Sequence, residues 1–207
     1  MIRSVGRLLV CLLATTSVCQ ARSVSVRVQT ADGAALAEAV VYARSPAPYA
    51  PPGRAAIMDQ VHKNFFPYIL PVQAGTWVDF PNSDSINHHV YSFSPAKRFE
   101  LQLDRNDHSP HRVLFDTPGL VTLGCNIHDW MLGYVLVLDT PWFAQTDASG
   151  EARLELPDEG EWRVSIWHPR IADAAESLER PLPGAQLLIE LREPLKPDLR
   201  EQQGSYE

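Results

Sequence analysis

The chain has 207 residues, of which 45% are hydrophobic and 21% charged, and its formal net charge is −7. This length allows one large domain or two small ones with a real core. The acidic balance argues against nucleic acid or an anionic membrane surface as a partner. The 17 prolines and many short β-branched runs favour an all-β protein rich in loops.

Residues 1–21 have the pattern of an export signal. Arg3 and Arg7 form a basic region, Leu8 to Val18 an apolar region, and small residues end at Ala21, which predicts cleavage after that residue. The apolar part is shorter than the roughly 20 residues of a membrane span, so we expect no membrane insertion after cleavage. We therefore expect a periplasmic protein, whose net charge after cleavage is −9.

Cleavage leaves one cysteine in the exported protein. Cys11 and Cys19 are removed with the signal, and only Cys125 remains. A lone thiol in an oxidising compartment has no intramolecular partner and is either reactive, bound to a metal, or buried and inert.

The segment 22–53 predicts a first hairpin followed by a linker. Between residues 23 and 44, Val24, Val26 and Val28 alternate with polar residues, a turn follows at 31–33, and 40–42 forms the return strand. Residues 45–53 contain four prolines and predict a stiff, extended connector.

The segment 54–139 is a succession of short strands separated by turn residues. Eight such strands at close spacing predict a sandwich or a barrel. The expected strands are 57–61, 68–72, 76–80, 88–93, 99–103, 112–115, 119–124 and 134–138.

The loop between the last two of these strands contains three potential metal ligands. Cys125, His128 and Met131 are spaced Cys-x2-His-x2-Met, and apolar strands lead in and out of the loop. Two histidines and one cysteine in a trigonal set with a weak axial methionine describe an electron-transfer copper site. His88 or His89 offers the second imidazole, and only one of them can face the metal because neighbouring strand side chains point to opposite faces.

After residue 139 the pattern returns to short alternating strands. We expect strands at 152–156, 161–167 and 185–191, and a flexible tail at 193–207 because that segment is charged and poor in apolar residues.

Two resemblances follow from these motifs. Residues 23–44 together with 146–167, including Thr-Asp-x-x-Gly and Leu-Pro-x-x-Gly-x-Trp-x-Val, look like a carboxypeptidase-regulatory or transthyretin-like sandwich. Residues 58–139, with Gly-Thr-x-Val-x-Phe-Pro-Asn-x-Asp before His88 and the Cys-x2-His-x2-Met loop, resemble the cupredoxins, and in loop spacing amicyanin. The expected fold class is therefore all-β, with a cupredoxin-like Greek-key sandwich at 54–139 inserted in, or packed against, a small transthyretin-like sandwich at 22–53 and 140–192.

The resemblance implies one type 1 copper held by His88, Cys125, His128 and Met131. Plastocyanin-like proteins usually have His-Asn-Val where this chain has His88-His89-Val90. That asparagine ties the two ligand loops together, so His89 would substitute as a donor or would itself be the ligand. Asn87 and Asn126 are candidates for orienting the metal-bound groups.

The remaining histidines are expected to have no metal-binding role, and three aromatic residues are candidates for a docking surface. His62, His108 and His111 are expected to be solvated, and His168 is expected to pack structurally. An apolar rim of Phe65, Phe66 and Trp130 around His128 would form a docking patch and an exit for the electron.

The resulting functional hypothesis is a one-electron carrier that exchanges electrons with a partner such as a c-type cytochrome or a dehydrogenase. The chain is also similar to exported proteins found with methylamine-utilisation genes, and this resemblance suggests a role in methylamine utilisation. The alternatives are copper storage or delivery, and a module that binds carbohydrate or protein without metal. A multicopper enzyme is not expected, because such enzymes typically need His-x-His pairs and the chain has none.

Overall fold

The computed structural model describes residues 21–45, 50, 52–109, 111–158, 160–172 and 179–200. Within them the chain forms strands and one short 3₁₀ turn at 199–200, so the predicted all-β fold class is confirmed. In these ranges no helix has the length and hydropathy of a membrane span. The predicted export signal lies outside the described residues except for Ala21, and so does most of the proline-rich linker.

The strands have the following bounds: β1 (Ala21–Gln29), β2 (Val40–Arg44), β3 (Ala56–Ile57), β4 (Asp59–Val61), β5 (Asn64–Phe66), β6 (Ile69–Gln73), β7 (Thr76–Asp79), β8 (His88–Ser94), β9 (Lys97–Leu103), β10 (Arg112–Phe115), β11 (Gly119–Cys125), β12 (Leu132–Leu138), β13 (Phe143–Gln145), β14 (Glu151–Pro157), β15 (Arg163–Trp167), β16 (Arg180–Pro181) and β17 (Gln186–Glu190).

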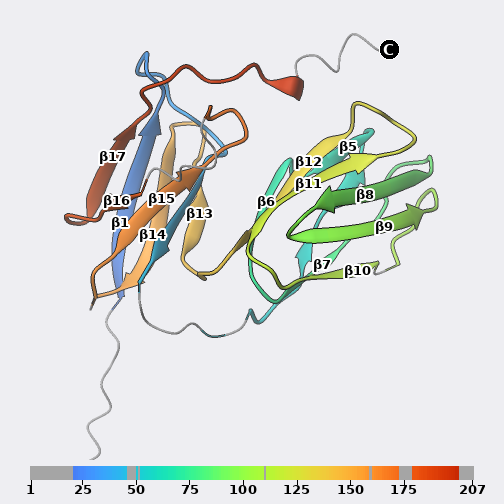
Figure 1. Ribbon diagram of the computed structural model, residues 1–207, viewed down its shortest axis with the longest axis horizontal. Coiled ribbons are helices and arrows are strands. Elements are labelled where there is room, and N and C mark those ends of the chain that lie inside the picture. Colours follow the sequence, from blue (N-terminus) through green and yellow to red (C-terminus); the bar gives the residue numbers. More distant parts are fainter. Residues whose placement is uncertain are drawn as a thin grey trace, which may run out of the picture.

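These strands build two sandwiches that lie next to each other (Figure 1). The first combines the sheets β14-β1-β17 and β13-β2-β15-β16, which draw on both ends of the described chain. The second combines the sheets β6-β12-β11-β8-β9 and β10-β7-β3, with the hairpin β4-β5 beside them. All strands of the second sandwich lie in sequence between β2 and β13.

Three apolar clusters hold the four sheets together. One fills the first sandwich and includes Val24, Val26 and Val28, while a second fills the other sandwich and includes Val121 and Leu123. The third takes residues from both sandwiches and lies between the sheets β13-β2-β15-β16 and β6-β12-β11-β8-β9.

The third cluster explains why two strands are apolar on both faces. On β2, Val41 and Ala43 belong to the first core, whereas Val40 and Tyr42 belong to the interface. Side chains alternate between the two faces of a strand, so an unbroken apolar run buries both faces.

The strand β12 repeats this division on the other side of the interface. Val135 and Val137 face the core of the second sandwich, and Leu136 and Leu138 face the interface. Tyr134 stands edge-on to Trp167 of the first sandwich, with ring centroids 5.6 Å apart.

The prediction that the two strands within residues 23–44 pair with each other as a hairpin is wrong. Both of its strands exist, but β1 pairs with β14 and β17, whereas β2 pairs with β13 and β15. The alternation of polar and apolar residues identifies the strands but not their partners. Strand β1 pairs with strands more than 100 residues away, so the connection from β1 to β2 crosses from one sheet to the other.

The expected strand at 57–61 is also divided. Ala56–Ile57 pairs with β7, and Asp59–Val61 pairs with Asn64–Phe66 in a hairpin that the sequence analysis did not predict. Its turn residues His62 and Lys63 have φ of 51° and 57°. Such angles normally call for glycine or asparagine, so the sequence carries no turn signal here.

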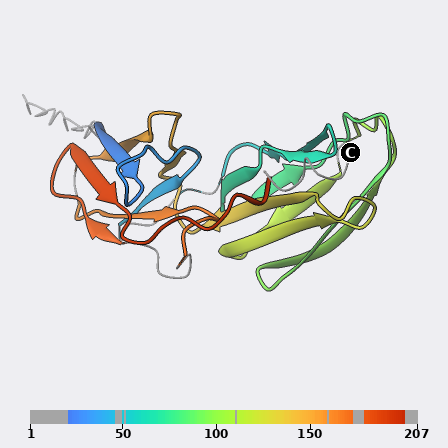
Figure 2. The ribbon, with the colours of Figure 1, turned by 90° about the horizontal axis from the view of Figure 1, so that it is seen from above.

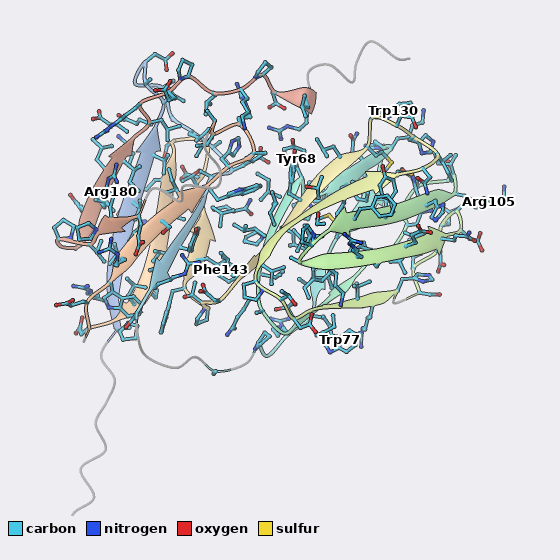
Figure 3. All side chains as sticks on the ribbon, viewed as in Figure 1. Tyr68, Trp77, Arg105, Trp130, Phe143 and Arg180 are labelled. Carbon is cyan, nitrogen blue, oxygen red and sulfur yellow. The ribbon has the colours of Figure 1, made fainter. Side chains whose placement is uncertain are left out.

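The segment 193–200 differs from the expected flexible tail. It runs from β17 toward the second sandwich (Figure 2). Arg200 donates to Glu38 Oε2 of the first sandwich at 2.7 Å, and its guanidinium lies 4.3 Å above the ring of Tyr68 in the second. Tyr68 lies between the two sandwiches (Figure 3), so this segment contacts both. Residues 201–207 lie outside the described ranges.

Truncating the interface should destabilise the protein. Leu136 is 7% exposed in the third cluster, so we expect Leu136→Ala to lower the free energy of unfolding by about 2–5 kcal/mol in chemical denaturation. The control is Leu188→Ala, at a position that is 52% exposed, with an expected loss below about 1 kcal/mol. Equal losses in the two variants would show that the interface contributes no stability.

The buried ring of His168 should make stability depend on pH. Burial, and then the positive charges of Arg170 and Arg200, lower the pKa of His168 to about 4, although Asp198 acts in the opposite direction. Between pH 6.5 and 4 the unfolded chain therefore binds a proton that the folded chain does not, so stability falls as the pH falls.

In that window we expect His168 to account for a loss of about 3 kcal/mol, measured by urea denaturation at a series of pH values. His168→Gln should flatten this part of the pH profile, while His108→Gln, at an exposed position, should leave it as in the wild type. A profile of unchanged slope in His168→Gln would contradict the assignment.

Candidate metal centre

The candidate centre lies where β8 and β11 run side by side. The two strands pair antiparallel, with Gly124 opposite Tyr91 and Cys125 opposite Val90. This pairing brings His88 next to Cys125, which is 37 residues later in the chain. A Cβ at Gly124 would lie 2.6 Å from Cζ of the Tyr91 ring, so a larger residue here would displace that ring.

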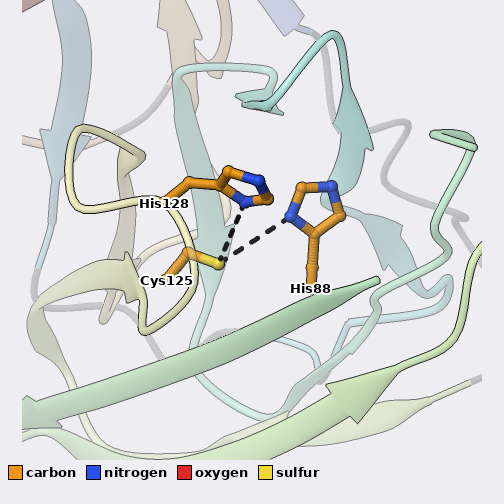
Figure 4. Close-up of side chains that lie close together, drawn as sticks. All are labelled: His88, Cys125 and His128. Atoms are coloured by element: carbon orange, nitrogen blue, oxygen red, sulfur yellow. Dashed lines mark hydrogen bonds between the residues drawn. The ribbon is translucent and has the colours of Figure 1, made fainter. Parts of the chain in front are cut away.

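Three predicted ligands converge (Figure 4). Cys125 Sγ lies 3.8 Å from His88 Nδ1 and 3.8 Å from His128 Nδ1. The ligand atoms of the three residues all lie within 4.8 Å of one another. His88 and Cys125 are buried, whereas His128 is partly exposed, so one edge of the group faces solvent.

Met131 closes the loop that carries Cys125 and His128. Its amide donates to the carbonyl of His128 at 3.0 Å, and its side chain is buried in the same apolar cluster as Cys125. The loop therefore folds back at the start of β12, as the sequence predicts. The role of its thioether as an axial ligand stays a prediction.

Of the two adjacent histidines, His88 is the one beside the thiol. The alternation along β8 buries His88, Val90 and Ser92 and turns His89 to the other face. There the Nδ1 atom of His89 lies 3.1 Å from Asn126 Nδ2, and its Nε2 atom lies 3.5 Å from Glu100 Oε2.

His89 does tie the two ligand-bearing segments together, but not as the expected donor. The side-chain amide of Asn126 donates to His89 Nδ1, and the backbone amide of Asn126 donates to the carbonyl of His89 at 3.0 Å. Asn87, the other candidate for orienting a ligand, instead accepts a bond from the backbone amide of Arg105.

The site favours a thiolate. Burial by itself raises the pKa of Cys125, but hydrogen bonds with His88, with the backbone of His89 and Ile127, and with His128 lower it to about 6. The thiolate is the form of cysteine that binds metals. The group therefore presents one soft anionic ligand at neutral pH.

The donor atoms have the spacing of a trigonal metal set. Metal–sulfur and metal–nitrogen bonds of about 2.3 and 2.0 Å at 120° would separate the sulfur from each nitrogen by about 3.7 Å. The observed separations are both 3.8 Å. One thiolate and two imidazoles with these sulfur–nitrogen separations fit copper.

Sequence reasoning missed Asp84, which lies behind His88. Its Oδ2 atom lies 2.9 Å from His88 Nε2. Burial alone lowers the pKa of His88, but hydrogen bonds with Cys125 and Asp84 outweigh it and raise the pKa above its usual value. The signal was an acidic residue four positions before the histidine, the last residue of the Phe-Pro-Asn-x-Asp motif.

The other candidates do not belong to the group of His88, Cys125 and His128. His111 pairs with Asp107 at 2.7 Å, and His108 is exposed, as expected. In the predicted apolar rim, the ring centroid of Trp130 lies 5.4 Å from that of His128, and Phe66 is 66% exposed. Phe65 is instead buried in the core of the second sandwich.

No family model matches the chain, and no curated protein matches it. Solved structures of three copper proteins are similar to part of it. A purple cupredoxin from Nitrosopumilus maritimus is 24% identical over 40% of this chain and 99% of its own, with a TM-score of 0.35. The Cu(I) form of an amicyanin mutant is 20% identical over 47% of this chain and 99% of its own, with a TM-score of 0.36. The copper-containing nitrite reductase of Thermus scotoductus is 22% identical over 47% of this chain and 27% of its own, with a TM-score of 0.37. Likenesses of this strength carry no argument about function.

The lowered pKa of Cys125 can be tested in the metal-free protein. We expect the ultraviolet absorbance of the thiolate to titrate with a midpoint near pH 6 instead of 9. Between these values the folded protein binds fewer protons than the unfolded chain, so its stability should rise with pH.

Replacing the first hydrogen-bonding partner of the thiol, in His88→Ala, should move the midpoint upward, while His108→Ala should not. A wild-type midpoint near 9 would contradict the hydrogen-bonding arrangement.

Proposed function

We propose that the protein is a periplasmic one-electron carrier with a single type 1 copper held by His88, Cys125, His128 and Met131. The observation that carries this proposal is the group of one sulfur and two Nδ1 atoms, in which the sulfur lies 3.8 Å from each nitrogen. Copper at such a site supplies a one-electron couple between Cu(II) and Cu(I).

The residues of this chain set the conditions for that couple. Cys125 is held as a thiolate by hydrogen bonds, and His88 is fixed in the interior. Because both are anchored on paired strands, these two donors are kept in one arrangement whichever redox state is bound. We propose no substrate chemistry, and therefore no enzymatic activity.

The partly exposed His128 provides a route for exchange with a partner protein. Beside it Ile127 is 54% exposed, and the ring centroid of Trp130 lies 5.4 Å from that of His128, so apolar surface is available at the ligand loop. A redox partner such as a c-type cytochrome or a dehydrogenase would dock here, and the net charge of −9 after cleavage favours a basic one.

The proposed compartment and pathway rest on the sequence. The export pattern of residues 1–21 supports a periplasmic location, and a single remaining cysteine is compatible with an oxidising compartment. Methylamine utilisation as the associated process is proposed from the resemblance of motifs only.

Copper storage or delivery is the second candidate. The observation in its favour is the same partial exposure of His128, since a ligand at the surface can pass Cu(I) to another protein. The two candidates differ in whether the protein cycles reversibly between Cu(II) and Cu(I) at a thiolate-ligated site.

Loading with copper tests the proposal. We expect one copper per chain, an intense visible band from the Cu(II)–thiolate bond, and reversible one-electron voltammetry. Cys125→Ser should abolish the band and the voltammetric response because the hydroxyl does not replace the thiolate, and it should leave the fold largely intact. His108→Gln serves as the control for a histidine remote from the site.

Two results would count against the carrier. Reversible electrochemistry retained in Cys125→Ser would exclude Cys125 as the ligand. Tight binding of Cu(I) by the wild type without a visible band on oxidation would favour storage or delivery.

A further inference from the structure

The carboxylate of Asp84 is built into the interior side of the candidate centre. It is 9% exposed, and its Oδ2 atom lies 2.9 Å from His88 Nε2. The other ring nitrogen of His88, Nδ1, faces Cys125 Sγ. A carboxylate without a proton accepts hydrogen bonds only, so the contact keeps a proton on Nε2 of His88 and leaves Nδ1 as the nitrogen that would bind a metal.

Asp84 is held in place by the β4-β5 hairpin. Its Oδ1 atom accepts from the amide of His62 at 2.6 Å, and its Oδ2 atom accepts from the amide of Lys63 at 2.8 Å. These are the two turn residues with positive φ, a conformation that costs residues other than glycine about 1–3 kcal/mol. The turn therefore directs two successive amides at one carboxylate.

A buried asparagine fixes the backbone of the same loop. Asn82 Oδ1 accepts from the amide of Asp84 at 3.0 Å, and its Nδ2 atom donates to the carbonyls of Ile86 and Asp104. The segment leading into His88 is thus tied both to itself and to the end of β9. Asp84 has no freedom to turn away from the histidine without breaking several of these bonds.

The carboxylate keeps its negative charge in this position. Burial alone raises the pKa of Asp84, but hydrogen bonds from Lys63, His88 and His62 outweigh it and hold the pKa below its usual value. A fixed negative charge thus lies one imidazole ring away from the donor nitrogen.

We propose that Asp84 is a positioning residue that orients His88 and lowers the reduction potential of the bound copper. The inference rests on the proposed function, since it concerns copper held by His88. A hydrogen bond from Nε2–H to a carboxylate makes the imidazole a stronger electron donor and adds negative charge near the metal. Both effects stabilise Cu(II) relative to Cu(I), the product of its one-electron reduction.

The test compares Asp84→Asn with the wild type, both loaded with copper. The remaining side-chain oxygen can keep the bonds to His88 and Lys63, so the substitution mainly removes the charge and the bond from the His62 amide. We expect the ratio of Cu(II) to Cu(I) affinities to fall at least tenfold, as is typical of outer partners of metal ligands. For a one-electron couple measured against an electrode, this raises the potential by about 59 mV.

Asp59→Asn is the matched control. Asp59 is on the same hairpin and accepts bonds from the amide and hydroxyl of Ser83, next to Asp84, but it makes no bond to His88. The variant removes an equal charge and loosens the same loop. If the hydrogen bond between Asp84 and His88 sets the reduction potential of the bound copper, the potential of Asp59→Asn should stay close to that of the wild type.

A second measurement reports the hydrogen bond itself. In the diamagnetic Cu(I) form, the Nε2–H proton of His88 should give a slowly exchanging resonance by nuclear magnetic resonance. Asp84→Asn should shift this resonance upfield, while Asp59→Asn should leave it in place. A purely structural role for Asp84 predicts lower thermal stability with neither the resonance nor the potential changed beyond the control.

The outcomes separate the two proposals. A wild type that binds no copper, or binds it without the thiolate band, overturns the proposed function together with this inference. A wild type with the band, combined with a potential for Asp84→Asn that moves no further than that for Asp59→Asn, overturns this inference alone.

Discussion

The register between β8 and β11 is the constraint on which the candidate centre depends. Cys125 lies opposite Val90, and His88 shares the buried face of β8 with Val90 and Ser92. A slip of one residue would turn His89 toward the core and His88 toward solvent, because side chains alternate between faces. The apolar core that selects the register therefore also selects the histidine. The stability of the sandwich and the geometry of the site have the same physical origin.

The site has an interior and an exterior side with different properties. On the interior side His88 is buried and held by Asp84, whose own position is set by the hairpin turn at His62 and Lys63. On the exterior side His128 is partly exposed on a loop. The rigid side determines which atoms meet, and the open side leaves His128 accessible to solvent. Cys125, between them, is hydrogen-bonded to both histidines.

The two sandwiches are connected through the same strand that ends the ligand loop. Met131 is followed at once by β12, whose Leu136 and Leu138 form the interface while Val135 and Val137 fill the core behind the site. A strand that is apolar on both faces can serve two layers at once. This explains why the apolar run Leu132–Leu138 follows the ligand loop directly.

Local patterns in the sequence determined the all-β class, the positions of most strands and the spacing of Cys125, His128 and Met131 on a turn, because alternation and loop spacing depend on neighbouring residues. They restricted the second imidazole to two adjacent histidines. Only the tertiary structure decided between these two, separated β1 from β2, ordered the segment 193–200 and brought Asp84 to His88. Each of these depends on pairing or contact with a distant or oppositely facing segment, whose free energy is not a property of the local sequence.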